Sequence, residues 1–578
     1  MSSSCSFTPP LEGWEVRKPD LELIKELSEQ FSLSHPAALV MANRGMTVEK
    51  SNLFLDSSLA SLTDPFRLPD MQKAVERIFQ AIENKEKIIV HGDYDTDGVT
   101  SSTLLNWVLE AYGANTKVFI SNRLDDGYGP TVSTMEKHAA QGVNLVISTD
   151  CGITSFEAAA YAAKANIDFI ITDHHNPADT LPIAYAIVNP RISTKVLDLY
   201  SLAGVGVAFK VCHALLKHGS KDGLKPPVDL RSGLDLVALG TIADSCPLTG
   251  ENRALVKNGL KLLNLNPRAV LRALYEATTL DSHITASDIS RKISPKINAA
   301  GRVGDPMVSA KLLASQNIHE ARQLVNQLKN FNRIRRNTEK SAYMEAFEIA
   351  KKQAKSNPPV LIIVGPNWHP GVIGLLSTKI SKHFGIPSIV LSKDKDPNDL
   401  LGSGRSCNSI NILESLKGCS SLLKSFGGHP MAVGLSLTNC DLEEFKTTFT
   451  SLLNTERHLC APKGNPYLKF DGPLTFKELN PGFINDLERM EPFGSGNDAP
   501  IFLFRNLKIT NSRHPISSVV SGLLVDEESL SFPFTYYSPY STTDFEEHAE
   551  YDIIGTPYRS LEEQNCRILI QAIFKVEL

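Results

Sequence analysis

The sequence lacks the features that mark export, membrane insertion and disulfide-stabilised folds. No apolar run approaches the length of a membrane span. The serine-rich first ten residues do not form a charged and then apolar signal pattern. Its nine cysteines are scattered and form no CxxC pair, which argues against a structural zinc site or a disulfide framework. We therefore expect a cytoplasmic protein with no membrane partner.

Net charge is also low, at −5 for 578 residues, but it is unevenly distributed. Residues 251–356 contain 19 Lys and Arg residues against 9 Asp and Glu residues, so this segment carries +10 and the rest of the chain carries −15. A basic segment in an acidic chain is typical of a phosphate-binding surface, although charge alone favours a solvated helical face.

The length predicts several domains, because one core rarely exceeds about 300 residues. From Lys87, short β-rich runs alternate with helical stretches, which predicts an α/β fold with a parallel sheet. A long helix is expected from Ile318 to about Lys355, followed by a second, smaller α/β unit and then by the short strands of a β-barrel. The predicted domains are a helical lead-in (1–72), a first α/β domain (73–250), a basic helical connector (251–356), a second α/β domain (357–455) and a β domain (463–578).

The most informative stretch is His91-Gly92-Asp93-Tyr94-Asp95-Thr96-Asp97-Gly98, which follows a buried-strand pattern and precedes a helical one. Open α/β sheets place their sites at such strand ends. Three carboxylates this close would repel one another unless a cation neutralised them. Oxygen ligands with one imidazole suit Mg²⁺ or Mn²⁺. A simple Asp/Gly turn is the alternative.

Three further runs, each interpreted as strand-like, end in ionisable residues: Asp150, then Asp173-His174-His175, then Asp244. Singly, each has an ordinary explanation, such as a helix cap or a packed core histidine. Together they are expected to converge in one cleft, because parallel strands end at the same edge of a sheet. Six or more hard ligands suffice for two cations roughly 3.5–4 Å apart, the usual arrangement for displacement at phosphorus.

These motifs resemble those of the DHH phosphoesterases, and among them the RecJ exonucleases. Asp173-His174-His175 is the signature of the family, and all four motifs occur in its order. The other stretches that resemble RecJ are 68–71, 125–129, 243–248, 297–302, 402–406 and 427–429. The resemblance implies a DHH domain, a DHH-associated second α/β domain and an oligonucleotide-binding-like last domain. It also implies a 5′→3′ exonuclease that releases 5′-mononucleotides from single-stranded DNA, in DNA repair and recombination.

The resemblance further implies roles for single residues. One metal ion would be held by His91, Asp95 and Asp150, and the other by Asp97, Asp150, His174 and Asp244. The catalytic set would be Asp150, Asp173, His175 and Arg302. Within it, His175 stabilises charge on the scissile phosphate, Arg302 contacts phosphate, and Asp173, like Asp93, orients its neighbours through hydrogen bonds.

The resemblance also implies a phosphate-binding loop at 402–406, where backbone N–H groups and Ser403, Gly404, Arg405 and Ser406 would bind the terminal 5′-phosphate. His429 would lie nearby. Arginine suits this task because its planar fork binds two oxygens at once. A tight structural turn is the alternative reading of the same glycines.

Two rival functions stay open. The first is hydrolysis of a nanoRNA, a cyclic dinucleotide or pyrophosphate, which would need neither the long helix nor the last domain. The second is a non-catalytic replication scaffold, which would have no need of intact ligands. The residues do not decide between Mn²⁺ and Mg²⁺, although imidazole ligands favour Mn²⁺. Single-strand-binding protein and a helicase are candidate partners, and a monomer is expected.

Overall fold

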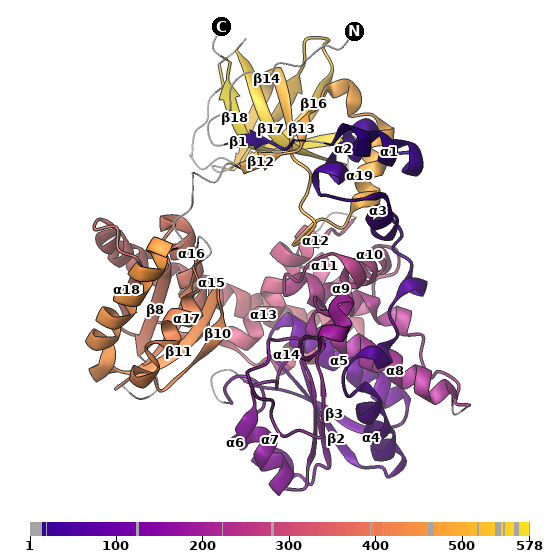
Figure 1. Ribbon diagram of the computed structural model, residues 1–578, viewed down its shortest axis with the longest axis vertical. Helices are drawn as coiled ribbons and strands as arrows, with labels where there is room; N and C mark the ends of the chain where they lie inside the picture. The colour runs from indigo at the N-terminus through magenta and orange to yellow at the C-terminus, as the bar shows by residue number, and fades with distance from the viewer. Residues whose placement is uncertain are drawn as a thin grey trace.

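Five parallel strands form the sheet at the centre of the first α/β unit in this computed structural model (Figure 1). In sheet order they are β3 (Asn115–Ile120), β2 (Lys87–Gly92), β4 (Leu145–Thr149), β5 (Asp168–Thr172) and β6 (Ala186–Val188). The register pairs Gly92 with Thr149, and Thr149 with Thr172, so the three central strands end at one edge. The alternation of strands and helices predicted from Lys87 is confirmed for these five strands. The structure describes residues 14–18, 20–122, 126–221, 223–278, 283–393, 396, 398–407, 410–459, 468–516, 519–537, 545–546, 549–559 and 566–576.

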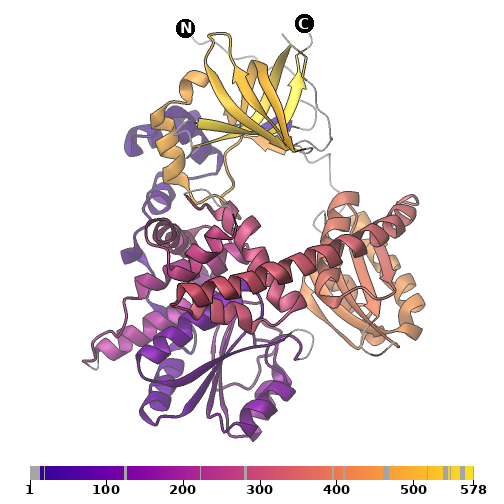
Figure 2. The ribbon, with the colours of Figure 1, turned by 180° about the vertical axis from the view of Figure 1, so that it is seen from behind.

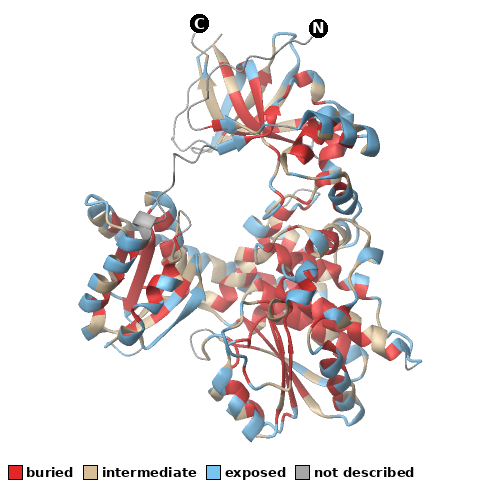
Figure 3. Cartoon of the chain, viewed as in Figure 1, coloured by how far each residue is buried: buried red, intermediate tan, exposed pale blue. Residues whose placement is uncertain are grey.

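Alternate side chains of these strands supply two separate cores. Ile88 and Val90 belong to a large core on one face, whereas Ile89 and Val146 belong to a smaller core on the other. The first face is covered by α4 (Met71–Glu83), α5 (Thr96–Ala111) and α8 (Gly204–Lys221), and the second by α6 (Val132–Ala140) and α7 (Phe156–Lys164). Buried residues accordingly run along the strands in Figure 3.

One element of this unit differs from our expectation. The apolar run before Asp244, interpreted as strand-like, is the helix α9 (Leu234–Ala243). Every residue from Leu234 to Ile242 is buried, and a helix buried on all sides shows no polar face by which its period could be recognised. Asp244 is therefore presented by the C-terminal end of a helix, where it is the capping residue.

The regular elements in the described part of the basic connector are all helical: α10 (Gly250–Leu265), α11 (Ala269–Glu276), α12 (Ala286–Asp288), a π-turn (Ile289–Ile293), α13 (Ser294–Val303), α14 (Met307–Ala314) and α15 (Ile318–Ala354). The 37 residues of α15 span about 55 Å and join the two α/β units, as predicted (Figure 2). No described helix is long and apolar enough to cross a bilayer.

The second α/β unit contains a mixed sheet in the order β10-β11-β9-β8-β7. Its elements are β7 (Leu361–Gly365), α16 (Pro370–Phe384), β8 (Ser388–Lys393), β9 (Asp399–Arg405), α17 (Ile412–Lys417), β10 (Ser425–His429), β11 (Ala432–Thr438) and α18 (Leu442–Leu459). The expected loop at 402–406 is wrong: residues 402–405 lie in β9, between β8 and β11. Its glycines serve strand packing, since a Cβ at Gly404 would lie 2.6 Å from the Val433 side chain.

The last part of the chain is a β-barrel, as predicted. Strands β14 (Phe502–Ile516), β15 (Val519–Val525), β16 (Ser531–Tyr537), β18 (Cys566–Lys575) and β17 (Glu550–Arg559) pair in that order, and β17 pairs back to β14. Before the barrel come β12 (Leu468–Phe470), β13 (Gly472–Pro473) and α19 (Pro481–Met490).

The N-terminal helices pack on this barrel and not on the sheet that follows them in sequence (Figure 1). These helices are α1 (Leu21–Phe31), α2 (His35–Asn43) and α3 (Val48–Leu55), and β1 (Trp14–Val16) pairs with β12 in parallel. Met41 of α2 and Phe483 of α19 belong to one core. Both ends of the chain thus build one unit.

This unit contacts the connector through buried cations on α10. The Arg253 Nε donates to the Phe54 carbonyl at 2.9 Å, and its guanidinium lies 3.8 Å from the centre of the Phe54 ring. Lys257 Nζ donates to the Arg489 carbonyl at 3.0 Å. Burial, with added repulsion from Glu488, raises the pKa of the nearby Glu491 to about 7.

We expect Glu491→Gln to stabilise the protein at pH 7.5 but not at pH 4.5. The folded-state pKa of Glu491 lies above its unfolded value, so the folded state holds the proton more tightly, and unfolding free energy is lost as pH rises from about 4.5 to 7, by at most about 3 kcal/mol. Urea denaturation at both pH values measures the difference. Glu444→Gln, at an exposed position, is the control. A variant less stable than wild type at pH 7.5 would contradict this reading.

Candidate metal centre

The first motif forms a tight turn between β2 and α5. The Asp95 carboxylate caps α5, because its Oδ1 accepts the backbone N–H groups of Asp97 at 2.9 Å and Gly98 at 3.1 Å. Residue 98 must be glycine, since a Cβ there would lie 2.5–2.7 Å from the backbone of Asp93. The turn therefore fixes three carboxylates at the edge of the sheet.

Helix α13 of the connector holds this turn in place. The Asn298 Oδ1 accepts hydrogen bonds from the Thr96 N–H at 2.7 Å and from the Thr96 hydroxyl at 2.6 Å. Gly301 allows close packing, because a Cβ there would lie 2.6 Å from the Tyr94 carbonyl oxygen. The 297–302 stretch thus supports the first motif.

The start of α8 positions Asp97 and Asp150. Oδ2 of Asp97 accepts the N–H of Gly204 at 2.7 Å, and Oδ1 accepts that of Val205 at 2.9 Å. Asp150 is 2% exposed and follows β4 with φ +62°, a left-handed conformation that residues other than glycine rarely adopt. A Cβ at residue 204 would overlap the Asp150 carboxylate, so this helix can approach only with glycine there.

Asp173 organises the two histidines that follow it. Its Oδ1 accepts the backbone N–H groups of His174 at 2.7 Å and His175 at 3.0 Å, and also the ring Nδ1–H of His175 at 2.8 Å. Burial opposes ionisation of Asp173, but the hydrogen bond and charge of His175 outweigh it and lower the pKa of Asp173 to about 2.

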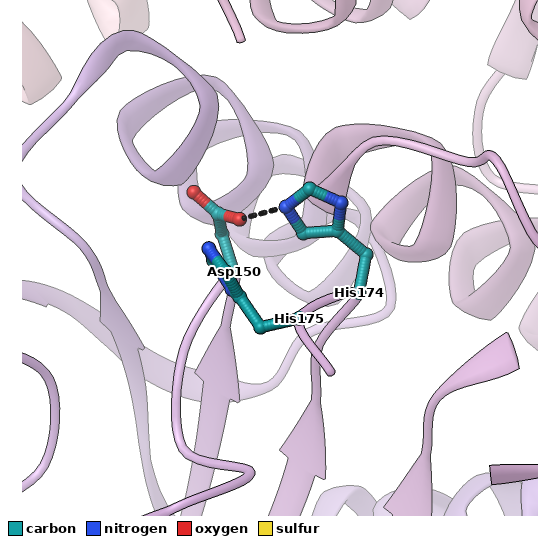
Figure 4. Close-up of side chains that lie close together, drawn as sticks. All are labelled: Asp150, His174 and His175. Atoms are coloured by element: carbon teal, nitrogen blue, oxygen red, sulfur yellow. Dashed lines mark ion pairs between the residues drawn. The ribbon is translucent and has the colours of Figure 1, made fainter. Parts of the chain in front are cut away.

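The ring of His174 faces the Asp150 carboxylate (Figure 4). Its Nε2 is 3.0 Å from Asp150 Oδ1, 3.7 Å from Asp244 Oδ2 and 3.9 Å from Asp97 Oδ2. Three residues also offer carboxylate oxygens within 4.8 Å of one another: Asp93, Asp95 and Asp150. The structure therefore brings residues of all four motifs into one cluster, as predicted, although Asp244 reaches it from the end of a helix and not from a strand.

This donor set fits a divalent cation. Oδ1 of Asp150 and both ring nitrogens of His174 are buried without a hydrogen-bond partner among the described residues. Burial, followed by the neighbouring carboxylates, raises the pKa of Asp150 and of Asp97 well above the usual value, which a bound cation would reverse. Burial also lowers the pKa of His174 to about 4, so its ring is neutral and has the lone pair that a metal needs.

His175 is instead a cation at neutral pH. Burial lowers its pKa, but the hydrogen bond and charge of Asp173 outweigh burial and raise it to about 9. Atoms of His175, Asp150 and His174 lie within 4.8 Å of one another. Because an imidazolium has no lone pair to give a metal, His175 is suited to donating a charge-assisted hydrogen bond to an anion.

Cys246 is a member of the cluster that the sequence analysis missed. Its Sγ lies 3.1 Å from Asp244 Oδ2, and both residues offer atoms within 4.8 Å of His174. The thiol is buried and donates to the carboxylate, so it restricts the rotation of Asp244. Its position two residues after Asp244 was the signal available.

His91 does not join the cluster in the structure. It is fully buried in β2, with Nε2 at 2.7 Å from Ser121 Oγ and Nδ1 at 3.4 Å from His138 Nε2. Burial, with repulsion from His138, lowers the pKa of His91 to about 3. Its role as a metal ligand stays a prediction and would require the ring to leave these partners.

The second α/β unit reaches this site through His429. Its ring stacks on His175 with centroids 5.9 Å apart, and its Nδ1 lies 3.5 Å from Asn176 Nδ2. Ala432 of β11 pairs with His429 on one side and Arg405 on the other, which places Arg405 about 10 Å from His429 at the same end of the sheet.

The other residues expected to bind phosphate already have protein partners. Arg405 Nε donates to the Thr378 hydroxyl at 3.1 Å, and Arg302 Nη1 donates to the Gly371 carbonyl at 3.3 Å. The two serine hydroxyls donate to main-chain carbonyls: Ser403 to Val433 and Ser406 to Ile410. The backbone groups of Gly404 lie within the strand ladder.

Comparison with known proteins agrees with this geometry. Residues 87–241 match the DHH family, N-terminal domain, residues 357–455 match the DHHA1 domain, and residues 470–571 match the RecJ OB domain. The single-stranded-DNA-specific exonuclease RecJ of Dickeya dadantii is 35% identical over 80% of this chain and 83% of its own length. RecJ of Bacillus subtilis is 33% identical over 86% of this chain, which spans 62% of that protein. The crystal structure of Thermus thermophilus RecJ with Mn²⁺ superposes with a TM-score of 0.80 and 26% identity, covering 98% of this chain and 80% of that one.

The sheet, the ligand cluster and the two accompanying domains define a DHH-family phosphoesterase. Within this family the chain is most informatively compared with RecJ, because its identity to the Dickeya dadantii protein exceeds 30% over most of both chains. The chain belongs to the RecJ family of single-stranded-DNA-specific exonucleases.

Proposed function

We propose that this chain hydrolyses single-stranded DNA from the 5′ end and releases 5′-mononucleotides, with two divalent cations as cofactors. The observation that carries the proposal is the buried cluster around His174, in which Asp97, Asp150 and Asp244 lie within 3.9 Å of its Nε2. Burial of several carboxylates side by side lowers the free energy of unfolding, so this arrangement is better explained by cation binding than by a structural role.

Two groups of residues would hold the cations, Mn²⁺ or Mg²⁺. Asp150 belongs to both, with Asp95 and His91 on one side and with Asp97, His174 and Asp244 on the other. The chemistry that two such ions supply when bound is activation of a water molecule and neutralisation of phosphate charge. Cys246 and Asp173 act by orienting Asp244 and His175, respectively.

The catalytic residue that needs no metal is His175. Asp173 keeps its imidazole protonated, so His175 can donate an N–H to a non-bridging oxygen of the scissile phosphate as negative charge develops. His429 stacks on the His175 ring and limits its motion from the opposite domain. Arg302, on the helix that supports the first motif, adds a second cation for phosphate.

Polarity would follow from a 5′-phosphate site on the second α/β unit. Arg405 and His429 lie at the same end of the sheet, and His429 reaches the catalytic histidine. Ser403 and Ser406 would contribute hydroxyls, whereas the backbone N–H groups of β9 are engaged in the ladder and would not. A 5′-terminal phosphate bound at this site would place the next phosphodiester bond, one nucleotide towards the 3′ end, at the metal cluster.

The proposed setting is DNA repair and recombination in the cytoplasm, where thiols stay reduced. The described cysteines are free thiols, which agrees with that compartment. Single-strand-binding protein and a helicase would supply the substrate, and the enzyme would act as a monomer. Hydrolysis of a nanoRNA or cyclic dinucleotide is the second candidate, and only the shared catalytic fold favours it. A non-catalytic scaffold role would not explain why carboxylates and a neutral histidine are buried together.

Removal of divalent cations tests the proposal. We expect EDTA treatment to reduce hydrolysis of a single-stranded oligonucleotide to background, and Mn²⁺ or Mg²⁺ to restore it, because the proposed nucleophile is a water molecule that the cations activate. The Cys246 thiol does not replace it, since burial and the Asp244 carboxylate raise its pKa and keep it protonated. A blunt duplex of the same sequence is the control substrate and should stay intact. Full activity in EDTA after dialysis, or equal cleavage of the duplex, would contradict the proposal.

A further inference from the structure

A basic groove lies at the junction of α13, α15 and α16, apart from the ligand cluster. It encloses about 800 Å³ and is lined by seven Lys and Arg side chains but a single carboxylate, Glu339. Five of the cations come from α15, and four of these recur at intervals of three or four residues, which places them on one face of the helix: Lys329, Arg333, Arg336 and Lys340. They extend over about 16 Å of the helix axis.

The one carboxylate is already neutralised. Glu339 is 6% exposed, accepts a hydrogen bond from Arg335 Nη1 at 2.9 Å and forms an ion pair with Lys379 Nζ of α16 at 2.5 Å. The four cations on the exposed face of α15 form no ion pair with any carboxylate in the described part of the chain. Such crowding of like charge is unfavourable in isolation and favours a bound polyanion.

Two residues of the groove come from helices that also contact the proposed catalytic site. Lys296 lines it from α13, two residues before Asn298, which anchors the first metal motif. Lys379 lines it from α16, next to Thr378, the partner of Arg405. Figure 2 shows α15 running between the two α/β units, so the groove follows the element that joins them.

We infer that this groove binds the sugar–phosphate backbone of single-stranded DNA beyond the nucleotide being removed. The inference rests on the proposed function and names where the uncleaved part of the substrate lies. An open, elongated row of cations suits a repeating phosphate chain, whereas a single phosphate or nucleotide would call for a closed pocket. The one aromatic residue of the lining, Tyr343, is half-buried and has Lys379 Nζ 5.4 Å from its ring centre, so the lining favours phosphate over base contacts.

The test is the salt dependence of binding by a triple variant, Lys329→Gln, Arg333→Gln and Arg336→Gln. Binding of a 5′-phosphorylated 30-mer and of a 5′-phosphorylated trimer is measured in EDTA, so that neither is cleaved. Loss of three phosphate contacts should reduce the slope of log K against log salt for the 30-mer by about 2, which corresponds to about 100-fold weaker binding at 0.1 M salt if the affinities converge at 1 M. The affinity for the trimer should fall much less, because the trimer is too short to extend along the groove.

The matched control removes three charges at the C-terminal end of the same helix, outside the groove: Lys351→Gln and Lys352→Gln in the last turn, and Lys355→Gln at the capping position. Its slope should equal that of wild type. The inference is overturned if the groove variant keeps the wild-type slope or if the slope falls equally in both variants. It is also overturned if the affinity for the trimer falls as much as the affinity for the 30-mer. Failure of the proposed function is distinct, because the wild type would then release no nucleotide in Mn²⁺.

Discussion

Asp150→Asn is expected to lower the rate of oligonucleotide hydrolysis by at least ~10³-fold, about 4 kcal/mol of transition-state stabilisation. Asp150 is the carboxylate shared by both proposed cation sites, and its Oδ1 lies 3.0 Å from His174 Nε2. Asparagine keeps the shape but cannot supply the charge. Steady-state hydrolysis with saturating Mn²⁺ measures the loss.

The same variant should be at least as stable as wild type without metal. Burial and four neighbouring carboxylates raise the pKa of Asp150, so removing its charge relieves repulsion in the metal-free protein. Thermal unfolding in EDTA and in Mn²⁺ separates the two effects, because only wild type should gain much from Mn²⁺. Asp179→Asn, in an exposed loop, is the control. A folded Asp150→Asn protein with wild-type activity would contradict the assignment.

His175→Ala is expected to lower kcat by about 10²–10³-fold while leaving Mn²⁺ affinity nearly unchanged. The hydrogen bond to Asp173 keeps the imidazole protonated, with a pKa of about 9, so it can stabilise phosphate charge but cannot bind a metal. Mn²⁺ binding followed by electron paramagnetic resonance, together with steady-state kinetics, gives both quantities.

His174→Ala provides the contrast, because His174 is neutral and lies among the carboxylates. Its loss should weaken Mn²⁺ binding as well as catalysis. His319→Ala, on the exposed start of α15, should change neither. Loss of Mn²⁺ affinity in His175→Ala equal to that in His174→Ala would show that His175 is a ligand and would contradict the role argued here.

The parts of the site that sequence predicts best are those in which strand and motif coincide. Asp150 and Asp173 directly follow short apolar strands, and parallel pairing alone brings such ends to one edge. Asp244 reached the same cluster by a different route, from the end of α9. The prediction of convergence was confirmed there although the element was wrong, because a fully buried helix and a buried strand present the same unbroken apolar run.

Long-range partners account for what the sequence could not show. The Gly- and Ser-rich sequence around Gly404 predicts a loop, and only pairing with β8 and β11 makes Gly404 a strand residue. Cys246 resembles any core cysteine until the fold places it beside Asp244. No local pattern connects residues 14–16 with residues 468–470, so the union of the two ends of the chain lies beyond sequence patterning.

The most direct test of the central claim is digestion of two single-stranded oligonucleotides, one labelled at the 5′ end and one at the 3′ end, with Mn²⁺ and excess DNA. The account predicts early release of labelled mononucleotide from the 5′-labelled strand only, with the 3′ label retained on progressively shorter fragments. Early release of the 3′ label, or no cleavage of either strand by the folded protein, would contradict it.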